Sequence, residues 1–179
     1  MEMLKNFVRL RWHKSKSDAG QPKAEGMKKS DKMTINIRKA TKKDLPAIHA
    51  LVRELAVFEE SEAAFVASIE EYARDFEEGI FESQVAEAGG EVVGMTLYYM
   101  TFSTWKGKML YLEDFVVKEG FRELGIGQLL FDAFLKTARE KDCKLAKWQV
   151  LDWNETALKF YKKNKAIVEK DWWNVKIIF

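Results

Sequence analysis

Residues 111–138 constrain the fold of this chain more than any other stretch. An apolar run with two adjacent carboxylates leads through a loop with one arginine and two glycines into an amphipathic helical pattern. In such a strand-to-helix loop the backbone N–H groups and the helix N-terminus converge on one point, which suits an anion. Arg122 adds guanidinium donors at the loop, and Gly125 and Gly127 permit close approach of a ligand. The segment therefore predicts a phosphate-binding loop beside a buried strand.

Length and charge predict one domain with a basic extension. The chain has 179 residues and is 47% hydrophobic, which suits a single core. Residues 1–32 hold nine lysines and arginines against four acidic residues, leaving 21 basic and 24 acidic residues for the rest. We predict a basic, disordered extension over residues 1–32 and a folded domain over residues 33–179. The mildly acidic domain argues against nucleic acid as a partner and leaves small cationic substrates open.

Residues 1–32 permit other interpretations, and the rest of the composition bears on where the protein is located and whether it binds metal. Apolar residues among the first twelve permit a weak targeting or membrane-surface helix, and Met27 or Met33 permits a later start. No apolar run approaches the ~20 residues of a membrane span, so we expect no membrane partner. Cys143 is the only cysteine, and the two histidines lack ligand spacing. We therefore expect no disulfide, no metal and a cytoplasmic location.

Hydrophobic periodicity predicts an α/β (α+β) arrangement in which strands and helices alternate. The predicted strands cover residues 34–38, 83–88, 91–101, 109–117 and 145–151, and the predicted helices cover residues 45–58, 68–76, 126–141 and 155–163. The strand at 109–117 is apolar enough for burial on both faces. It should lie parallel and adjacent to the strand at 145–151 through a right-handed crossover. Residues 166–179 should close the sheet as one or two antiparallel strands.

Three motifs carry a resemblance to a known family. Arg122, Gly125 and Gly127 stand in an R-x-x-G-x-G loop, and Asn154 is followed seven residues later by Tyr161. A third motif joins Ser-Thr-Trp at 103–105 to Leu-Glu-Asp-Phe at 112–115. From residue 33 onward the chain thus resembles the GCN5-related N-acetyltransferases (GNAT), and the third motif resembles their diamine group, which acts on spermidine/spermine or thialysine. The resemblance implies the GNAT fold, with a mixed, mostly antiparallel sheet, a parallel pair splayed at the acetyl-CoA site and about four helices.

The resemblance also implies roles for individual residues. Acetyl-CoA, the cosubstrate, would be held by the strand backbone, the glycine loop and the start of the last helix, namely Phe115, Val116, Val117, Arg122, Glu123, Leu124, Gly125, Ile126, Gly127, Gln128 and Asn154. The amine would contact Phe58, Glu59, Trp105, Glu113 and Asp114. An alkylamine has a pKa near ~10 and must lose a proton before it attacks. Glu113 is the expected base, acting through water, and Tyr161 the expected acid that protonates the departing thiolate.

Some positions leave alternatives open or depart from the family pattern. Neighbouring residues of a regular strand face opposite ways, so the alternative for Glu113 and Asp114 is that one of them is an ordinary solvated or structural charge. Ser103 stands where polyamine-acting members carry Asp, which favours a lysine analogue or a short diamine over a long polyamine. Asn164 stands near the usual position of a helix-ending glycine. Since Asn can also adopt the left-handed conformation, we expect a small change of register there rather than a lost fold.

The resemblance thus implies an acetyl-CoA-dependent N-acetyltransferase that acts on the primary amine of a small cationic substrate, and, since members of the group are homodimers, we expect a homodimer. One alternative is a protein lysine or N-terminal acetyltransferase. Another is a non-enzymatic module that binds acetyl-CoA.

Overall fold

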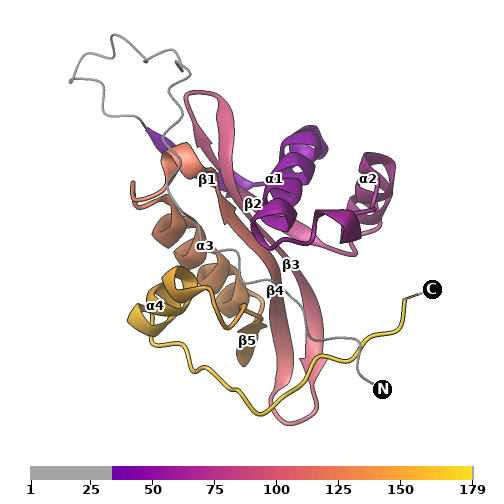
Figure 1. Ribbon diagram of the computed structural model, residues 1–179, viewed down its shortest axis with the longest axis vertical. Coiled ribbons are helices and arrows are strands. Elements are labelled where there is room, and N and C mark those ends of the chain that lie inside the picture. Colours follow the sequence, from indigo (N-terminus) through magenta and orange to yellow (C-terminus); the bar gives the residue numbers. More distant parts are fainter. Residues whose placement is uncertain (1–33, 179) are drawn as a thin grey trace, which may run out of the picture. The chain divides into compact units, whose positions relative to one another are not determined.

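The computed structural model describes residues 34–178, in which one sheet separates helices α1 and α2 from helices α3 and α4 (Figure 1). The strands are β1 Ile35–Lys39, β2 Glu82–Ala88, β3 Glu91–Ser103, β4 Gly107–Val117 and β5 Leu145–Trp148. The helices are α1 Leu45–Phe58, α2 Ile69–Glu77, α3 Ile126–Glu140 and α4 Glu155–Lys163. All nine elements were predicted, within a few residues at each end. The extension predicted over residues 1–32 lies outside the described residues.

The sheet is mixed, and its strand order is β1-β2-β3-β4-β5. Neighbouring strands are antiparallel except β4 and β5, which run parallel, as predicted. β5 pairs with β4 only from Met109 to Leu112 and ends at Trp148, three residues before its predicted end. Residues 113–117 of β4 therefore have β3 on one side and no strand on the other. This open strand edge corresponds to the splayed parallel pair that the resemblance implies.

A β-bulge places the two adjacent carboxylates of β4 on the same side of the sheet. Leu97 pairs with Asp114 and Tyr98 pairs with Leu112, so Glu113 is an extra residue opposite β3. Glu113 accepts a hydrogen bond from Tyr99, which packs on the core beneath α1, and Asp114 lines a recess beside α1. The expectation that they face opposite ways is therefore wrong, because an extra residue shifts the alternation of the strand.

The core has two sides, one under α1 and α2 and one under α3 and α4. Local signals explain the helices: Pro46 occupies the first turn of α1, and Ser68 forms a capping box with Glu71 at the start of α2. On the other side, Leu130 and Phe134 of α3 are fully buried against the sheet. β4 is buried unevenly, because Met109 and Tyr111 remain only half-buried near the hairpin end. Burial on both faces, predicted for this strand, thus does not extend to its first residues.

Gly94 lies where β3, β4 and α3 approach most closely, which yields a prediction on stability. A Cβ at this position would stand 2.9 Å from the carbonyl oxygen of Val116 and 3.1 Å from Leu130 Cδ1. Since the carbonyl belongs to the neighbouring strand, it cannot move without disturbing the ladder. We expect Gly94→Ala to lower the free energy of unfolding by about 1–3 kcal/mol in urea titrations. Gly120→Ala is the control, because nothing lies within 4 Å of its Cβ position. Equal stability of the two variants would contradict the packing.

The C-terminal segment differs from its prediction. Residues 166–178 form no strand in the structure, and large apolar side chains there, such as Trp173 at 92% and Val175 at 91%, are exposed. The strands predicted over residues 166–179 are therefore wrong for 166–178. The segment is rich in residues that favour strands, but a strand also needs a partner edge, and β5 offers only four residues.

The end of α4 shows the small change of register that the sequence predicts. Asn164 has a φ of −85°, and it is Lys165 that adopts the left-handed conformation, with a φ of 61°. The Ala166 N–H donates to the Tyr161 carbonyl at 3.0 Å, which is the closing bond of a Schellman motif. Asn164 instead exchanges hydrogen bonds with Gln128 of α3.

Within residues 34–178, no helix is both long and apolar enough to cross a bilayer.

Candidate active site

The loop before α3 offers a cluster of free N–H groups. Glu123 and Gly125 both have left-handed backbone, with φ of 65° and 81°, which curves the chain into a concave turn. Among the described residues, the N–H groups of 123–128 make no hydrogen bond outside α3, and the first turn of a helix offers them no acceptor. Gly127 has room for a Cβ, which would lie 3.6 Å from the Phe115 ring. The loop therefore has the donors that a pyrophosphate requires.

Arg122 is held at the base of this loop. Its Nε donates to the carbonyl oxygen of Val117 at 3.0 Å, and its guanidinium carbon lies 6.0 Å from the centre of the Phe58 ring. No hydrogen bond from its two Nη atoms to another described residue is present. Arg122 thus joins the open edge of β4 to the end of α1 and keeps two donor groups available.

The open edge of β4 lies between the loop and the acidic residues. Phe115, Val116 and Val117, the residues predicted to hold the cofactor by their backbone, belong to this edge. Phe115 itself packs on Phe131 and Phe160, at centroid distances of 6.2 and 5.8 Å. Its side chain is therefore part of the core, while its backbone faces the opening. An amide-containing chain can add to such an edge as a strand does.

Tyr161 lies in an aromatic cluster on the α4 side of the sheet. It is 7% exposed, and its ring lies 5.1 Å from Trp148 and 6.0 Å from Phe131. Burial raises the pKa of Tyr161 to about 12, so its hydroxyl stays protonated at physiological pH. Asn154 caps α4 by accepting a hydrogen bond from the Ala157 N–H at 3.1 Å. Asn154 thus orients the helix that carries Tyr161.

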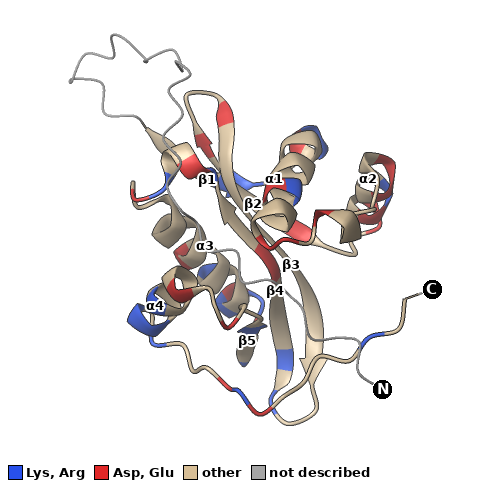
Figure 2. Cartoon of the chain, viewed as in Figure 1, with Lys and Arg blue, Asp and Glu red and all other residues tan. Residues whose placement is uncertain are grey.

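Three carboxylates gather beside the end of α1. Figure 2 shows acidic positions of β4 close to those at the end of α1 and in the turn after it. Asp114 and Glu59 line a recess of about 200 Å³ whose walls come from α1 and the residues after it: Val52, Leu55, Ala56, Ser61, Ala64 and Phe65. Glu113 lies next to it on the bulge, where the Tyr99 hydroxyl donates to its Oε2 at 2.9 Å. The recess combines apolar walls with negative charge, which suits an alkylammonium group.

Two carboxylates of this cluster, those of Asp114 and Glu59, have raised pKa values. Burial, followed by the charges of Glu113 and Glu59, raises the pKa of Asp114 to about 7. Burial also raises the pKa of Glu59. A cationic ligand would therefore stabilise the ionised form of these carboxylates. A carboxylate that titrates near neutral pH also suits proton transfer.

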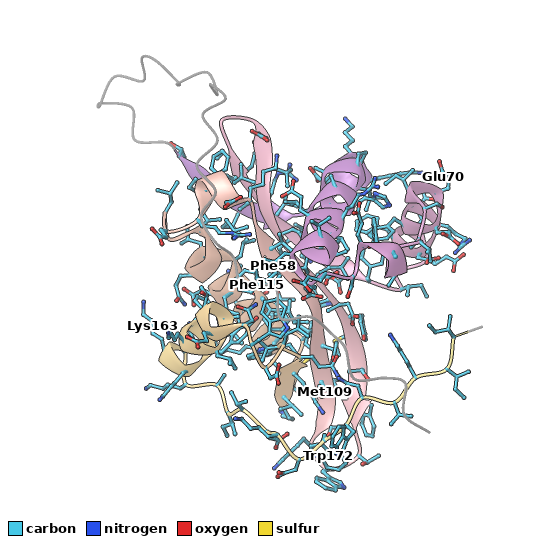
Figure 3. The ribbon with its side chains drawn as sticks, in the orientation of Figure 1. Phe58, Glu70, Met109, Phe115, Lys163 and Trp172 are labelled. Atoms are coloured by element: carbon cyan, nitrogen blue, oxygen red, sulfur yellow. The ribbon has the colours of Figure 1, made fainter. Side chains whose placement is uncertain are left out.

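The structure does not bring all predicted site residues together. Trp105 lies at the tip of the β3–β4 hairpin and is 84% exposed. Six residues of strand separate Gly107 from Glu113, a distance of about 20 Å, so Trp105 is remote from the acidic recess of its own chain. Leu124 is exposed on the loop, whereas Ile126 is buried beneath it. In Figure 3 the labelled Phe58 and Phe115 lie near the middle of the sheet, and Trp172 lies beyond the hairpin.

Two site residues escaped the sequence analysis. Tyr99, which orients Glu113, and Trp153, which packs on Phe58 at 5.5 Å, were assigned no role. Tyr99 stands in a regular strand pattern, and only the cross-strand register reveals its partner. Trp153 had a local signal, since it directly precedes Asn154 in a loop between a strand and a helix.

Comparisons with known proteins agree with this arrangement. Residues 45–165 match the Acetyltransferase (GNAT) family. A thialysine N-epsilon-acetyltransferase of Bos taurus is 36% identical over 152 residues, covering 78% of this chain and 89% of that protein. An L-ornithine N5-acetyltransferase of Arabidopsis thaliana is 26% identical over 189 residues, covering 79% of this chain and 83% of that protein.

A solved structure extends the agreement to the fold. The aminoglycoside acetyltransferase meta-AAC0020 from an uncultured soil metagenomic sample superposes with a TM-score of 0.69 at 21% identity, covering 81% of this chain and 96% of that one. The likeness confirms the α+β fold that the sequence predicts.

Proposed function

Because this chain belongs to the acetyltransferase (GNAT) family and is an acetyl-CoA-dependent N-acetyltransferase, we propose that it acetylates the primary amine of a small cationic substrate of the lysine-analogue or diamine type. The observation that carries this proposal is the position of the acidic pair. Glu113 and Asp114 stand at the start of the open β4 edge, on the side of the recess beside α1. A cofactor arm on that edge and an ammonium group in the recess would meet at these residues.

Each group of residues has a separate role in the proposal. Acetyl-CoA supplies an activated acetyl group. The N–H groups of 123–128 and Arg122 bind its pyrophosphate, and the backbone of 115–117 pairs with its amides and polarises the thioester carbonyl. Glu113 removes a proton from the ammonium through water, so that the amine nitrogen can form its new bond to carbon. Tyr161 donates its hydroxyl proton to the sulfur as the carbon–sulfur bond breaks.

Substrate size and charge favour a lysine analogue. Thialysine and ornithine, which two similar proteins are named for, each carry a terminal amine on a short chain. The recess of about 200 Å³ has room for such a chain, with Glu59 and Asp114 facing its charge. Phe58 and Glu59 at the end of α1 are the proposed anchors.

A substrate panel tests the proposal. We expect CoA release with thialysine, lysine and ornithine, weaker release with spermidine, and none with peptides that carry only a lysine side chain or a free N-terminus. The assay measures thiol release, with acetyl-CoA alone as blank. Turnover of peptides in preference to every free amine would establish the alternative of a protein acetyltransferase. No turnover of any amine despite measurable CoA binding would favour the non-enzymatic module.

We also propose that the protein is a homodimer. The exposed apolar side chains of residues 167–178 and the uncovered edge of β5 are the surfaces on this chain that association would bury. A monomeric mass by light scattering at micromolar concentration would contradict this part of the proposal.

A further inference from the structure

An aromatic contact crosses the opening between β4 and β5. Phe58 is the last residue of α1, and Trp153 lies in the segment between β5 and α4. Their ring centroids are 5.5 Å apart with an interplanar angle of 49°. The two side chains keep 43% and 51% of their surface exposed, and neither belongs to a buried core cluster. The contact therefore joins two segments at the surface, without a packing role in the core.

Arg122 extends this contact to the phosphate loop. Its guanidinium lies 6.0 Å from the centre of the Phe58 ring, within the range of a cation–π interaction. Its Nε is fixed on the carbonyl oxygen of Val117, the last residue of β4. Arg122, Phe58 and Trp153 thus form a continuous row of side chains from the loop to the start of α4, which we call the aromatic bridge.

The bridge lies beside residues 113–117 of β4, which continue beyond the end of the pairing with β5. β5 stops opposite Leu112, and the chain then runs through residues 149–154 to α4 while β4 continues to Val117. A ligand that pairs with residues 113–117 must therefore pass between the segment that carries Trp153 and the end of α1 that carries Phe58.

We propose that Trp153 is a positioning residue for acetyl-CoA, which closes with Phe58 over the cofactor arm on the open edge of β4. Two aromatic faces shield the strand-edge hydrogen bonds from water and pack on the hydrocarbon parts of the arm. Arg122 couples the two ends of the site, because one guanidinium contacts both Phe58 and, through its free Nη atoms, the pyrophosphate. The proposal requires acetyl-CoA as cosubstrate and is independent of which amine is acetylated.

The test measures CoA binding as well as turnover. We expect Trp153→Ala to raise the Kd for CoA, measured by calorimetry, and the KM for acetyl-CoA by about tenfold, equivalent to about 1.4 kcal/mol. kcat at saturating acetyl-CoA and the KM for the amine should change by less than about threefold. Trp153→Phe keeps an aromatic face toward Phe58 and should restore most of the affinity. Phe102→Ala, which removes an aromatic side chain that is 67% exposed at the hairpin end of β3, is the control and should leave the Kd unchanged.

A double-mutant cycle distinguishes a shared closure from two independent contacts. If the rings act together, Phe58→Ala combined with Trp153→Ala should weaken CoA binding little more than either change alone. Effects that multiply to about a hundredfold would overturn the joint action. An unchanged Kd for CoA in Trp153→Ala, with the protein folded by circular dichroism, would overturn the proposal itself. Because the binding measurement needs no amine, failure of the substrate proposal would leave this result interpretable.

Discussion

Tyr161→Phe should lower kcat by about 10²- to 10⁴-fold and change the KM for acetyl-CoA by less than about threefold. The variant removes one hydroxyl and keeps the ring, which packs on Trp148 at 5.1 Å and on Phe131 at 6.0 Å. The fold and the cofactor site should therefore survive, while the departing thiolate loses its proton donor. Steady-state kinetics with varied acetyl-CoA and a saturating amine measure the split between kcat and KM.

The pH profile adds a second readout for the same residue. Since burial raises the pKa of Tyr161 to about 12, the donor stays protonated at neutral and mildly alkaline pH. Loss of activity at alkaline pH should therefore not arise from Tyr161 below about pH 11. Tyr98→Phe is the control, because Tyr98 is fully buried in the same core cluster as Tyr161 and the change removes the same group, one hydroxyl. Equal loss of kcat in both variants would assign the effect to packing.

The acidic pair should separate into two phenotypes. We expect Glu113→Gln to lower kcat by about 10²- to 10⁴-fold, because the ammonium then has no base. Asp114→Asn should chiefly raise the KM for the amine and change the pH dependence. Asp114 has its pKa raised to about 7, so it is protonated below that pH and ionised above it. In the parent protein kcat/KM should therefore rise with pH through about 7, and Asp114→Asn should lose this limb.

The control for the pair is an acidic residue outside the recess. Glu54 lies on α1 and is exposed, so Glu54→Gln removes a negative charge without touching Glu59 or β4. Its pH profile should match the parent profile. If Asp114→Asn keeps the limb near pH 7, Asp114 is not its source and the role proposed for this residue is wrong.

Local patterns predicted much of this structure because they report local physics. The helix at 155–163 was predicted with its observed ends, since Asn154 caps it and its own hydrogen bonds are all short-range. The glycine loop was predicted because positive φ at Gly125 and the following helix are both properties of a few consecutive residues. The parallel pairing of β4 and β5 followed from the length of the crossover.

Other features depend on partners that a single sequence does not reveal. The bulge at Glu113 arises from the register between β3 and β4, so alternation within β4 alone misassigned the face of Asp114. The tail after Ala166 has the composition of a strand, but pairing decides whether it becomes one. The contact between Phe58 and Trp153 joins residues from the end of α1 and the start of α4, and only the fold brings them together.

Because of the bulge, the number of residues in β4 decides which of its side chains face the site. Tyr111 and Val116 can both face α1 only because β4 holds one residue more than β3 between the pairs Leu97–Asp114 and Tyr98–Leu112. A one-residue deletion in this stretch would restore regular pairing and turn either the acidic pair or the cofactor-facing residues to the opposite face. An alignment of related chains should therefore show substitutions between residues 111 and 117 but no gaps. Counting residues in this strand is thus a test for the site that needs no knowledge of the amine.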